Sequence, residues 1–113
     1  MTSFVDRLCA HFQCDVKLLI QRYQGERQGI HALISQMAVE CGLQVWCAAH
    51  GASGRIVDVE ERPVRAGLVE TMQKIFTHLG YTIRYPFLPY VYVHINQADG
   101  TKCYHLYPIE FLY

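Results

Sequence analysis

Apolar residues recur at helical spacing over the first third of the chain. Thr2 and Ser3 can cap a helix whose apolar stripe is formed by Phe4, Val5, Leu8, Cys9 and Phe12. Asp15 offers a second cap, so the pattern leaves open whether residues 3–24 form one kinked helix or two. A further stripe between Ile30 and Cys41 predicts another helix, which Gly42 ends in a left-handed conformation.

The period then changes to the alternation that is typical of strands. Residues 43–49 and 55–60 predict a hairpin. A helix follows from Pro63, which suits a first helical turn, and Gly80 closes it. Residues 81–85 and the stretch 90–108 alternate again and predict three more strands.

This order predicts one α+β domain over residues 1–113. N-terminal helices precede a β-hairpin, a helix and a three-stranded antiparallel unit, and all strands form one sheet packed on the helices (α-α-β-β-α-β-β-β). Apart from the leading helix, the order of helix, two strands, helix and three strands resembles Roadblock-type and profilin-like domains. The resemblance lies in element order, and it implies dimerisation or the scaffolding of partners.

The amino-acid composition limits the cellular location and the classes of partner that we expect. Hydrophobic residues make up 51% and charged residues 18% of the chain, and the formal net charge is zero. Five cysteines cannot all pair within one chain, and neither a signal peptide nor an apolar run of about 18 residues is present. We therefore expect a cytoplasmic protein with reduced thiols and no membrane contact. Basic residues are scattered, so nucleic acid is an unlikely partner.

Residues 90–108 contain the most unusual pattern. Strand alternation places Val91, Val93 and Ile95 on one face, and it places Tyr90, Tyr92, His94 and Asn96 on the other. The aliphatic face is expected to be the core face. Which residues of the second strand join each face depends on the register of the hairpin.

The turn allows two registers. A two-residue turn at Asp99–Gly100 places His94 opposite His105. A three-residue loop over 98–100 places His94 opposite Tyr104 and turns His105 toward the core side. We favour the first register, because aliphatic side chains then meet aliphatic ones and because a buried histidine needs a hydrogen-bond partner.

In the favoured register one face carries a cluster of aromatic polar residues, namely Tyr90, Tyr92, His94, His105 and Tyr107. Tyrosine is enriched at protein interfaces, because it combines a large rigid contact area with a polar tip. We therefore predict a protein–protein interaction module that acts stoichiometrically as a regulator, adaptor or inhibitor, with a homodimer through the sheet as one arrangement. No catalytic residue, cofactor or metal is predicted. The apolar end, residues 109–113, is expected to be pinned into the fold or into a partner.

Two alternatives use other residues. A metal- or thiol-dependent enzyme would use Cys103, His94 and His105 of the terminal hairpin. A nucleic-acid-binding protein would use the N-terminal helices, where Arg22 and Arg27 flank a helix–glycine–helix junction. The cluster Cys9-Ala-His11-Phe-Gln-Cys14 has irregular spacing for a structural zinc site, and Cys9 also belongs to the apolar stripe.

Overall fold

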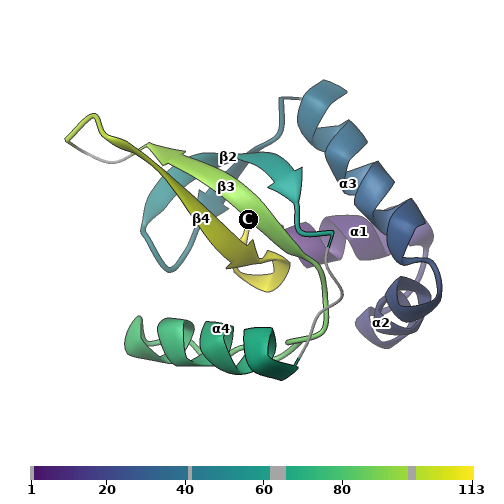
Figure 1. Cartoon of the computed structure of the whole chain (residues 1–113). Helices are drawn as coiled ribbons and strands as arrows, with labels where there is room; N and C mark the ends of the chain where they lie inside the picture. The colour runs from purple at the N-terminus through teal and green to yellow at the C-terminus, as the bar shows by residue number, and fades with distance from the viewer. Residues whose placement is uncertain (1, 41, 62–65, 97–98) are drawn as a thin grey trace.

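The computed structural model describes residues 2–40, 42–61, 66–96 and 99–113. These residues form a mixed α+β fold, as predicted, whose helices and strands run in nearly the predicted order (Figure 1). The elements are α1 (Phe4–Phe12), α2 (Val16–Gly25), α3 (Arg27–Glu40), β1 (Gln44–Cys47), β2 (Ala52–Val59), α4 (Ala66–His78), β3 (Tyr90–Asn96), β4 (Lys102–Pro108) and the 3₁₀-helix η1 (Ile109–Phe111).

Side-chain caps divide the N-terminal region into separate helices. The Ser3 hydroxyl accepts a hydrogen bond from the backbone N–H of Asp6 (3.1 Å), and the Asp15 carboxylate accepts one from Leu18 (2.8 Å). Between α1 and α2, Gln13 adopts a left-handed conformation with φ of 53°. A residue in this region ends a helix, so residues 3–24 form two helices and not one kinked helix. Gly42 is also left-handed, as predicted.

The four strands form one antiparallel sheet in the order β1-β2-β3-β4. The prediction of a strand over residues 81–85 is wrong, because this segment has no strand partner. The Glu110 carboxylate accepts hydrogen bonds from the backbone N–H groups of Arg84 (3.0 Å) and Tyr85 (2.8 Å) instead. A side chain thus replaces the neighbouring strand, and the element order of the Roadblock-type and profilin-like domains is not completed.

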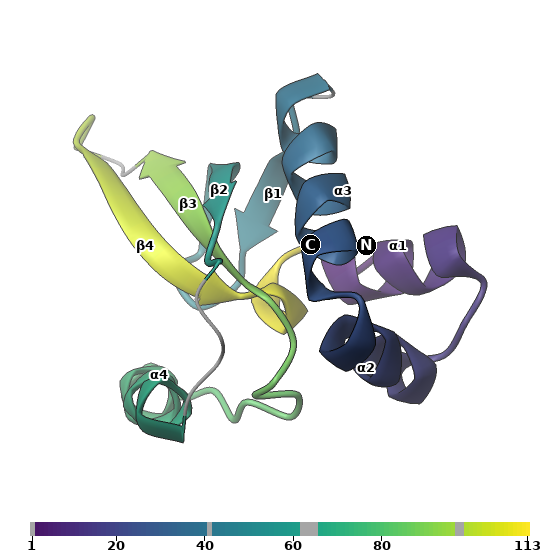
Figure 2. The ribbon, with the colours of Figure 1, turned by 45° about the vertical axis from the view of Figure 1, so that its right-hand side comes forward.

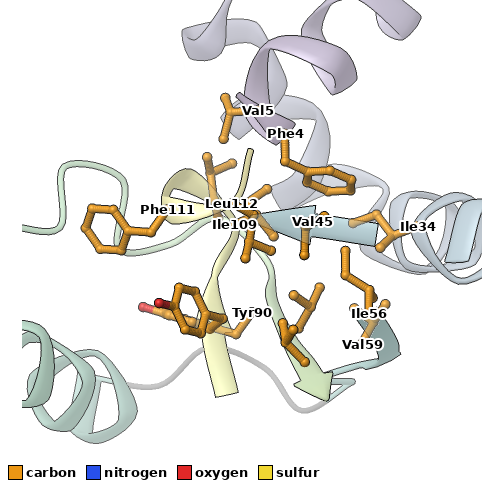
Figure 3. Packing of buried hydrophobic residues seen from close by; sticks show 14 of the residues in the cluster. Phe4, Val5, Ile34, Val45, Ile56, Val59, Tyr90, Ile109, Phe111 and Leu112 are labelled. Carbon is orange, nitrogen blue, oxygen red and sulfur yellow. The ribbon is translucent and has the colours of Figure 1, made fainter. Parts of the chain in front are cut away.

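The C-terminal segment closes the core along the outer edge of β1. The backbone N–H of Trp46 donates to the carbonyl of Tyr113 (2.8 Å), and the Tyr113 N–H donates to the carbonyl of Trp46 (3.1 Å). The N–H of Phe4, at the start of α1, donates to the carbonyl of Leu112 (2.8 Å). Figure 3 shows Leu112 and Ile109 among Phe4 of α1 and Val45 of β1. The apolar end is therefore pinned into the fold, which was one of the two expected arrangements.

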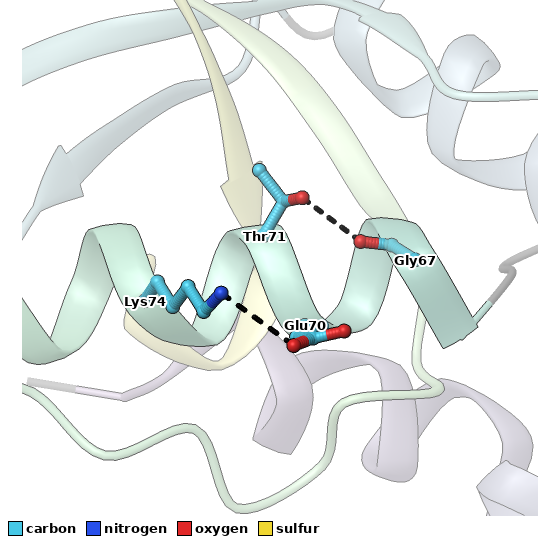
Figure 4. A network of polar contacts seen from close by, with 4 residues as sticks. All are labelled: Gly67, Glu70, Thr71 and Lys74. Atoms are coloured by element: carbon cyan, nitrogen blue, oxygen red, sulfur yellow. Dashed lines mark hydrogen bonds and ion pairs between the residues drawn. The ribbon is translucent and has the colours of Figure 1, made fainter.

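Helix α4 lies apart from α1–α3 in both views of the ribbon (Figures 1 and 2). It attaches through Phe76, whose ring packs edge-on against Tyr107 (centroids 5.2 Å apart) and stacks on Phe111 (5.1 Å). Its exposed side carries an ion pair between Glu70 and Lys74 (3.5 Å), one helical turn apart (Figure 4). Such an exposed pair contributes about 0.3–0.5 kcal/mol, so the buried aromatic contacts hold the helix in place.

The cysteines that the structure describes are free thiols: Cys9, Cys14, Cys47 and Cys103. Cys41 lies outside the described residues. No helix within the described ranges has both the length and the apolar character needed to cross a membrane.

Gly54 lies where β2 has no room for a side chain. A Cβ atom at this position would lie 2.6 Å from Val93 Cγ1 and 3.0 Å from the backbone oxygen of His94.

We expect Gly54→Ala to lower the free energy of unfolding by about 1–3 kcal/mol, because a backbone atom cannot move away easily. Urea denaturation measures the change. Gly29→Ala in α3 is the matched control, since a Cβ there meets no atom within 4 Å, and it should leave stability unchanged or raised. Equal effects of the two substitutions would contradict this explanation.

Candidate functional site

The register of β3 and β4 decides which side chains share a face. The structure pairs His94 with Tyr104, Tyr92 with Leu106 and Val93 with His105. This is the register of the three-residue loop, so the preference for the two-residue turn is wrong. His105 and Tyr107 consequently leave the face that carries Tyr92 and His94.

The chemistry of the turn explains this outcome. Gly100 is left-handed with φ of 86°, as the three-residue loop requires. The Asp99 carboxylate accepts hydrogen bonds from the backbone N–H (2.9 Å) and the hydroxyl (2.6 Å) of Thr101. These bonds also hold the pKa of the Asp99 carboxyl below its ordinary value. The turn is thereby fixed locally, and its geometry outweighs the matching of aliphatic side chains across the strands.

One face of the sheet, here called the outer face, remains open to solvent. A row of paired residues crosses all four strands from Gln44 through Arg55 and His94 to Tyr104. Residues that stand directly opposite each other project from the same face. The outer face consists of Gln44, Trp46, Ser53, Arg55, Asp58, Tyr92, His94, Asn96, Tyr104 and Leu106.

Aromatic side chains dominate this surface. Tyr104 is 66% exposed and Trp46 is 40% exposed. The rings of His94 and Tyr104 stack with their centroids 4.7 Å apart and their planes 16° apart. The His94 Nε2 atom is buried and forms no hydrogen bond with the described residues. Beside it, Gln44, Ser53, Arg55 and Asn96 line a polar hollow of about 350 Å³. The surface therefore combines stacked aromatic rings with unsatisfied polar groups.

Two tyrosines at the beginning of β3 have structural roles. Tyr90 is buried, and its hydroxyl donates to the carbonyl of Pro86 (2.6 Å). Burial, together with the negative charge of Glu110, raises the pKa of Tyr90 to about 12. The Tyr92 hydroxyl donates to the carboxylate of the buried Glu60. Of the predicted site residues, Tyr92 and His94 therefore belong to the outer face, whereas Tyr90 belongs to the core.

The remaining predicted residues lie on the opposite, inner face of the sheet. His50, in the turn between β1 and β2, shares a hydrogen bond between its Nδ1 atom and the Tyr107 hydroxyl (2.8 Å). Its ring lies 4.4 Å from the ring of His105. The His105 Nε2 atom is buried and has no hydrogen-bond partner in the described part of the chain. Among the described residues, His105 therefore lacks at Nε2 the hydrogen-bond partner that we expected a buried histidine to need, and its ring contacts that of His50.

The cluster expected for a metal- or thiol-dependent enzyme is not assembled. Cys103 pairs with Ile95 and His105 pairs with Val93 on the inner face, whereas His94 projects from the outer face. Within the described ranges, no group of three or more histidine, cysteine or acidic side chains is placed to hold a metal ion. Cys47 is buried near Tyr107, and burial raises the pKa of its thiol to about 11. Because the nucleophilic form is the thiolate, this thiol is poorly suited to attack a substrate at neutral pH.

Three candidate residues for nucleic-acid binding contact aromatic rings of the N-terminal helices. Arg22 lies over the ring of Phe12 (4.9 Å), and Arg27 lies over the ring of Tyr23 (5.0 Å). His31 is buried, and its Nε2 atom shares a hydrogen bond with the Tyr23 hydroxyl (2.8 Å). A buried imidazole that is held in this way does not face a nucleic-acid groove.

Comparisons with known proteins add no relative. No protein-family model, no curated protein and no solved structure matches the chain.

Sequence reasoning missed Trp46, Arg55 and Tyr104 as members of the outer face. The alternation in Gln44–Cys47 already separates Trp46 from the buried Val45 and Cys47, so this signal was present in the sequence. Tyr104 joins the face only in the observed register. Arg55 joins it through pairing between β2 and β3, which are separated by α4 in the sequence.

The inner histidines should make stability depend on pH. Burial, and secondarily the proximity of His105, lowers the pKa of His50 from 6.5. As the pH is lowered, His50 therefore takes up a proton at a higher pH in the unfolded chain than in the folded chain. We expect the free energy of unfolding to be constant above about pH 7 and to fall as the pH drops through 6.5 toward the folded-state pKa.

Urea denaturation at a series of pH values checks this expectation. His50→Gln should make the fall shallower, and a smaller fall should remain because burial also lowers the pKa of His31. His78→Gln, at an exposed position of α4, is the control and should leave the slope unchanged. An unaltered slope in His50→Gln would show that His50 does not titrate between the two states.

Proposed function

We propose that this chain is a protein–protein interaction module that acts stoichiometrically as a regulator, adaptor or inhibitor. Its binding surface in this proposal is the outer face of the sheet. The observation that carries the proposal is the row from Arg55 through His94 to Tyr104, in which Arg55 and Tyr104 are exposed and His94 is half-buried. A sheet face of aromatic residues that no element of the described chain covers favours contact with another molecule.

The residue types of the outer face support a protein as that molecule. Trp46 and Tyr104 provide large rigid rings, and Arg55 provides a planar cation. Tryptophan, tyrosine and arginine are the side chains that most often dominate the binding energy of protein interfaces. The hollow lined by Arg55 and His94 would accept polar groups of the partner.

A second copy of the chain is the occupant that the charges favour. Arg55 and Asp58 lie close together on β2, both exposed, and neither forms an ion pair with a residue that the structure describes. A two-fold axis between facing sheets would place Arg55 of each copy near Asp58 of the other. An interface of this symmetry must be complementary to itself, and a surface with one cation and one anion meets that condition.

Substitution of the exposed aromatic residues tests whether the outer face mediates self-association. We expect Trp46→Ala and Tyr104→Ala each to weaken self-association at least tenfold, because buried aromatic anchors contribute about 2 kcal/mol or more. Sedimentation equilibrium over a range of protein concentrations measures the dissociation constant. Lys74→Ala, on the distant exposed side of α4, should leave it unchanged. A chain that remains monomeric at the highest concentrations would contradict a second copy as the occupant.

Charge reversal tests the pairing of Arg55 with Asp58. Arg55→Glu and Asp58→Lys should each abolish the homodimer, because like charges then face each other across the two-fold axis. An equimolar mixture of the two variants should form a heterodimer, since one copy is then acidic and the other basic at this position. Sedimentation of the mixture gives the result. Failure to associate in the mixture, when both variants are folded by circular dichroism, would refute this arrangement of the two copies.

A further inference from the structure

A cavity of about 580 Å³ lies between α3 and the end of β2. Its walls include Arg27, His31, Ala32 and Ser35 of α3, together with Val59 and Glu61. Arg27, His31 and Ser35 are four residues apart in sequence and therefore share one face of the helix. The small side chain of Ala32 leaves the space between them open. The volume falls within the range of about 300–1,000 Å³ that is usual for small-molecule sites.

The guanidinium group of Arg27 has a hydrogen-bond donor that no described residue accepts. It lies over the ring of Tyr23, 5.0 Å from the centroid, which fixes its position. Its Nη1 atom is buried and has no hydrogen-bond partner among the described residues. A buried cationic donor without a partner is costly, so an acceptor atom that reached Nη1 would be stabilised there.

His31 adds a second oriented polar group to the same wall. It is only 8% exposed, and its Nε2 atom is held by the Tyr23 hydroxyl at 2.8 Å. With that hydroxyl donating, the neutral ring carries its proton on Nδ1, which is then a donor. The Tyr23 side chain thus positions both Arg27 and His31.

The other wall carries a negative charge. Glu61 is the second residue after the end of β2, lines the cavity and is exposed. The neighbouring Glu60 is buried and accepts a hydrogen bond from the Tyr92 hydroxyl, so its carboxylate has a structural partner. The cavity therefore offers a cation on α3 and an anion beyond β2. Neither a simple anion nor a simple cation matches both charges.

We propose that this cavity binds a small zwitterion of the free α-amino acid class. The carboxylate of the ligand is bound by Arg27, with His31 as a second donor, and its ammonium group is bound by Glu61. The site is separate from the outer face of the sheet, so it stands whether or not that face binds a second copy.

Binding is tested with the full chain and a panel of the twenty L-amino acids. Calorimetry gives the affinity, and proton–nitrogen NMR spectra of the histidine rings show whether His31 senses the ligand. For each amino acid that binds, the N-acetyl derivative lacks the ammonium group and the amide lacks the carboxylate. We expect both derivatives to bind at least tenfold more weakly. Failure of the whole panel to shift the His31 resonances would overturn the proposal, as would equal binding of the N-acetyl derivative.

Arg22 provides a matched control for Arg27. Each arginine lies over an aromatic ring, at 4.9 Å for Arg22 and 5.0 Å for Arg27, but only Arg27 lines the cavity and has a buried unpartnered nitrogen. Arg27→Gln should weaken binding at least tenfold, and Arg22→Gln should leave it unchanged. Equal effects of these substitutions would refute the site.

Two further variants test the cavity independently, in case Arg27→Gln folds poorly. Glu61→Gln removes the negative wall at an exposed position and should weaken the free amino acid but not its N-acetyl derivative. Ala32 is exposed on α3 and lines the cavity, so the larger side chain of Ala32→Leu should fill the cavity and exclude every ligand. The thermal midpoint of unfolding should stay unchanged. Unchanged affinity in either variant, with folding intact by circular dichroism, would count against the site.

Discussion

The hydrogen bonds from Thr101 to the Asp99 carboxylate, together with left-handed Gly100, fix the hairpin between β3 and β4 in one register. Because strand side chains alternate between faces, a shift of one residue would exchange every side chain of β4 from one face to the other. The stacking of His94 on Tyr104 and the contact of His105 with His50 both follow from this register. A few polar atoms in an exposed turn therefore determine the composition of both sheet faces.

Closure of the core depends on a second constraint, which joins the two ends of the described chain. Residues 111–113 pair along β1, and Phe4 at the start of α1 donates to Leu112. An uncovered edge of β1 would expose unpaired backbone groups, and this pairing satisfies them within the chain. The pairing covers the edge of β1 only, and β4 forms the other edge of the sheet. The proposed intermolecular contact is made by side chains of the outer face.

Several polar groups in the interior are satisfied in pairs. Tyr23 holds His31, Tyr92 holds Glu60, and Tyr107 holds His50. In each pair a tyrosine hydroxyl satisfies an ionisable side chain without adding a second charge to the core. Among the described residues, Arg27 Nη1 and the Nε2 atoms of His94 and His105 do not complete such a pair. Arg27 lines a cavity and His94 lines a hollow, and the two proposals concern these places.

The sequence by itself determined the helical segments, the cap residues, the positions of the two hairpins and the aliphatic strand face, because these features depend on residues close together in the chain. It left open whether residues 3–24 form one helix or two, and its favoured register for the second hairpin was wrong. Ser3, Asp15 and Gly42 act where their side chains or backbone preferences predict. The tertiary structure alone decided that residues 81–85 are not a strand, since Glu110 occupies their backbone donors from 25 or 26 residues away. It also decided the pairing that brings Arg55 beside His94 on the outer face, and the juxtaposition of Arg27, His31 and Glu61. Those arrangements depend on strand pairing and helix packing between distant segments, and no local pattern encodes either of them.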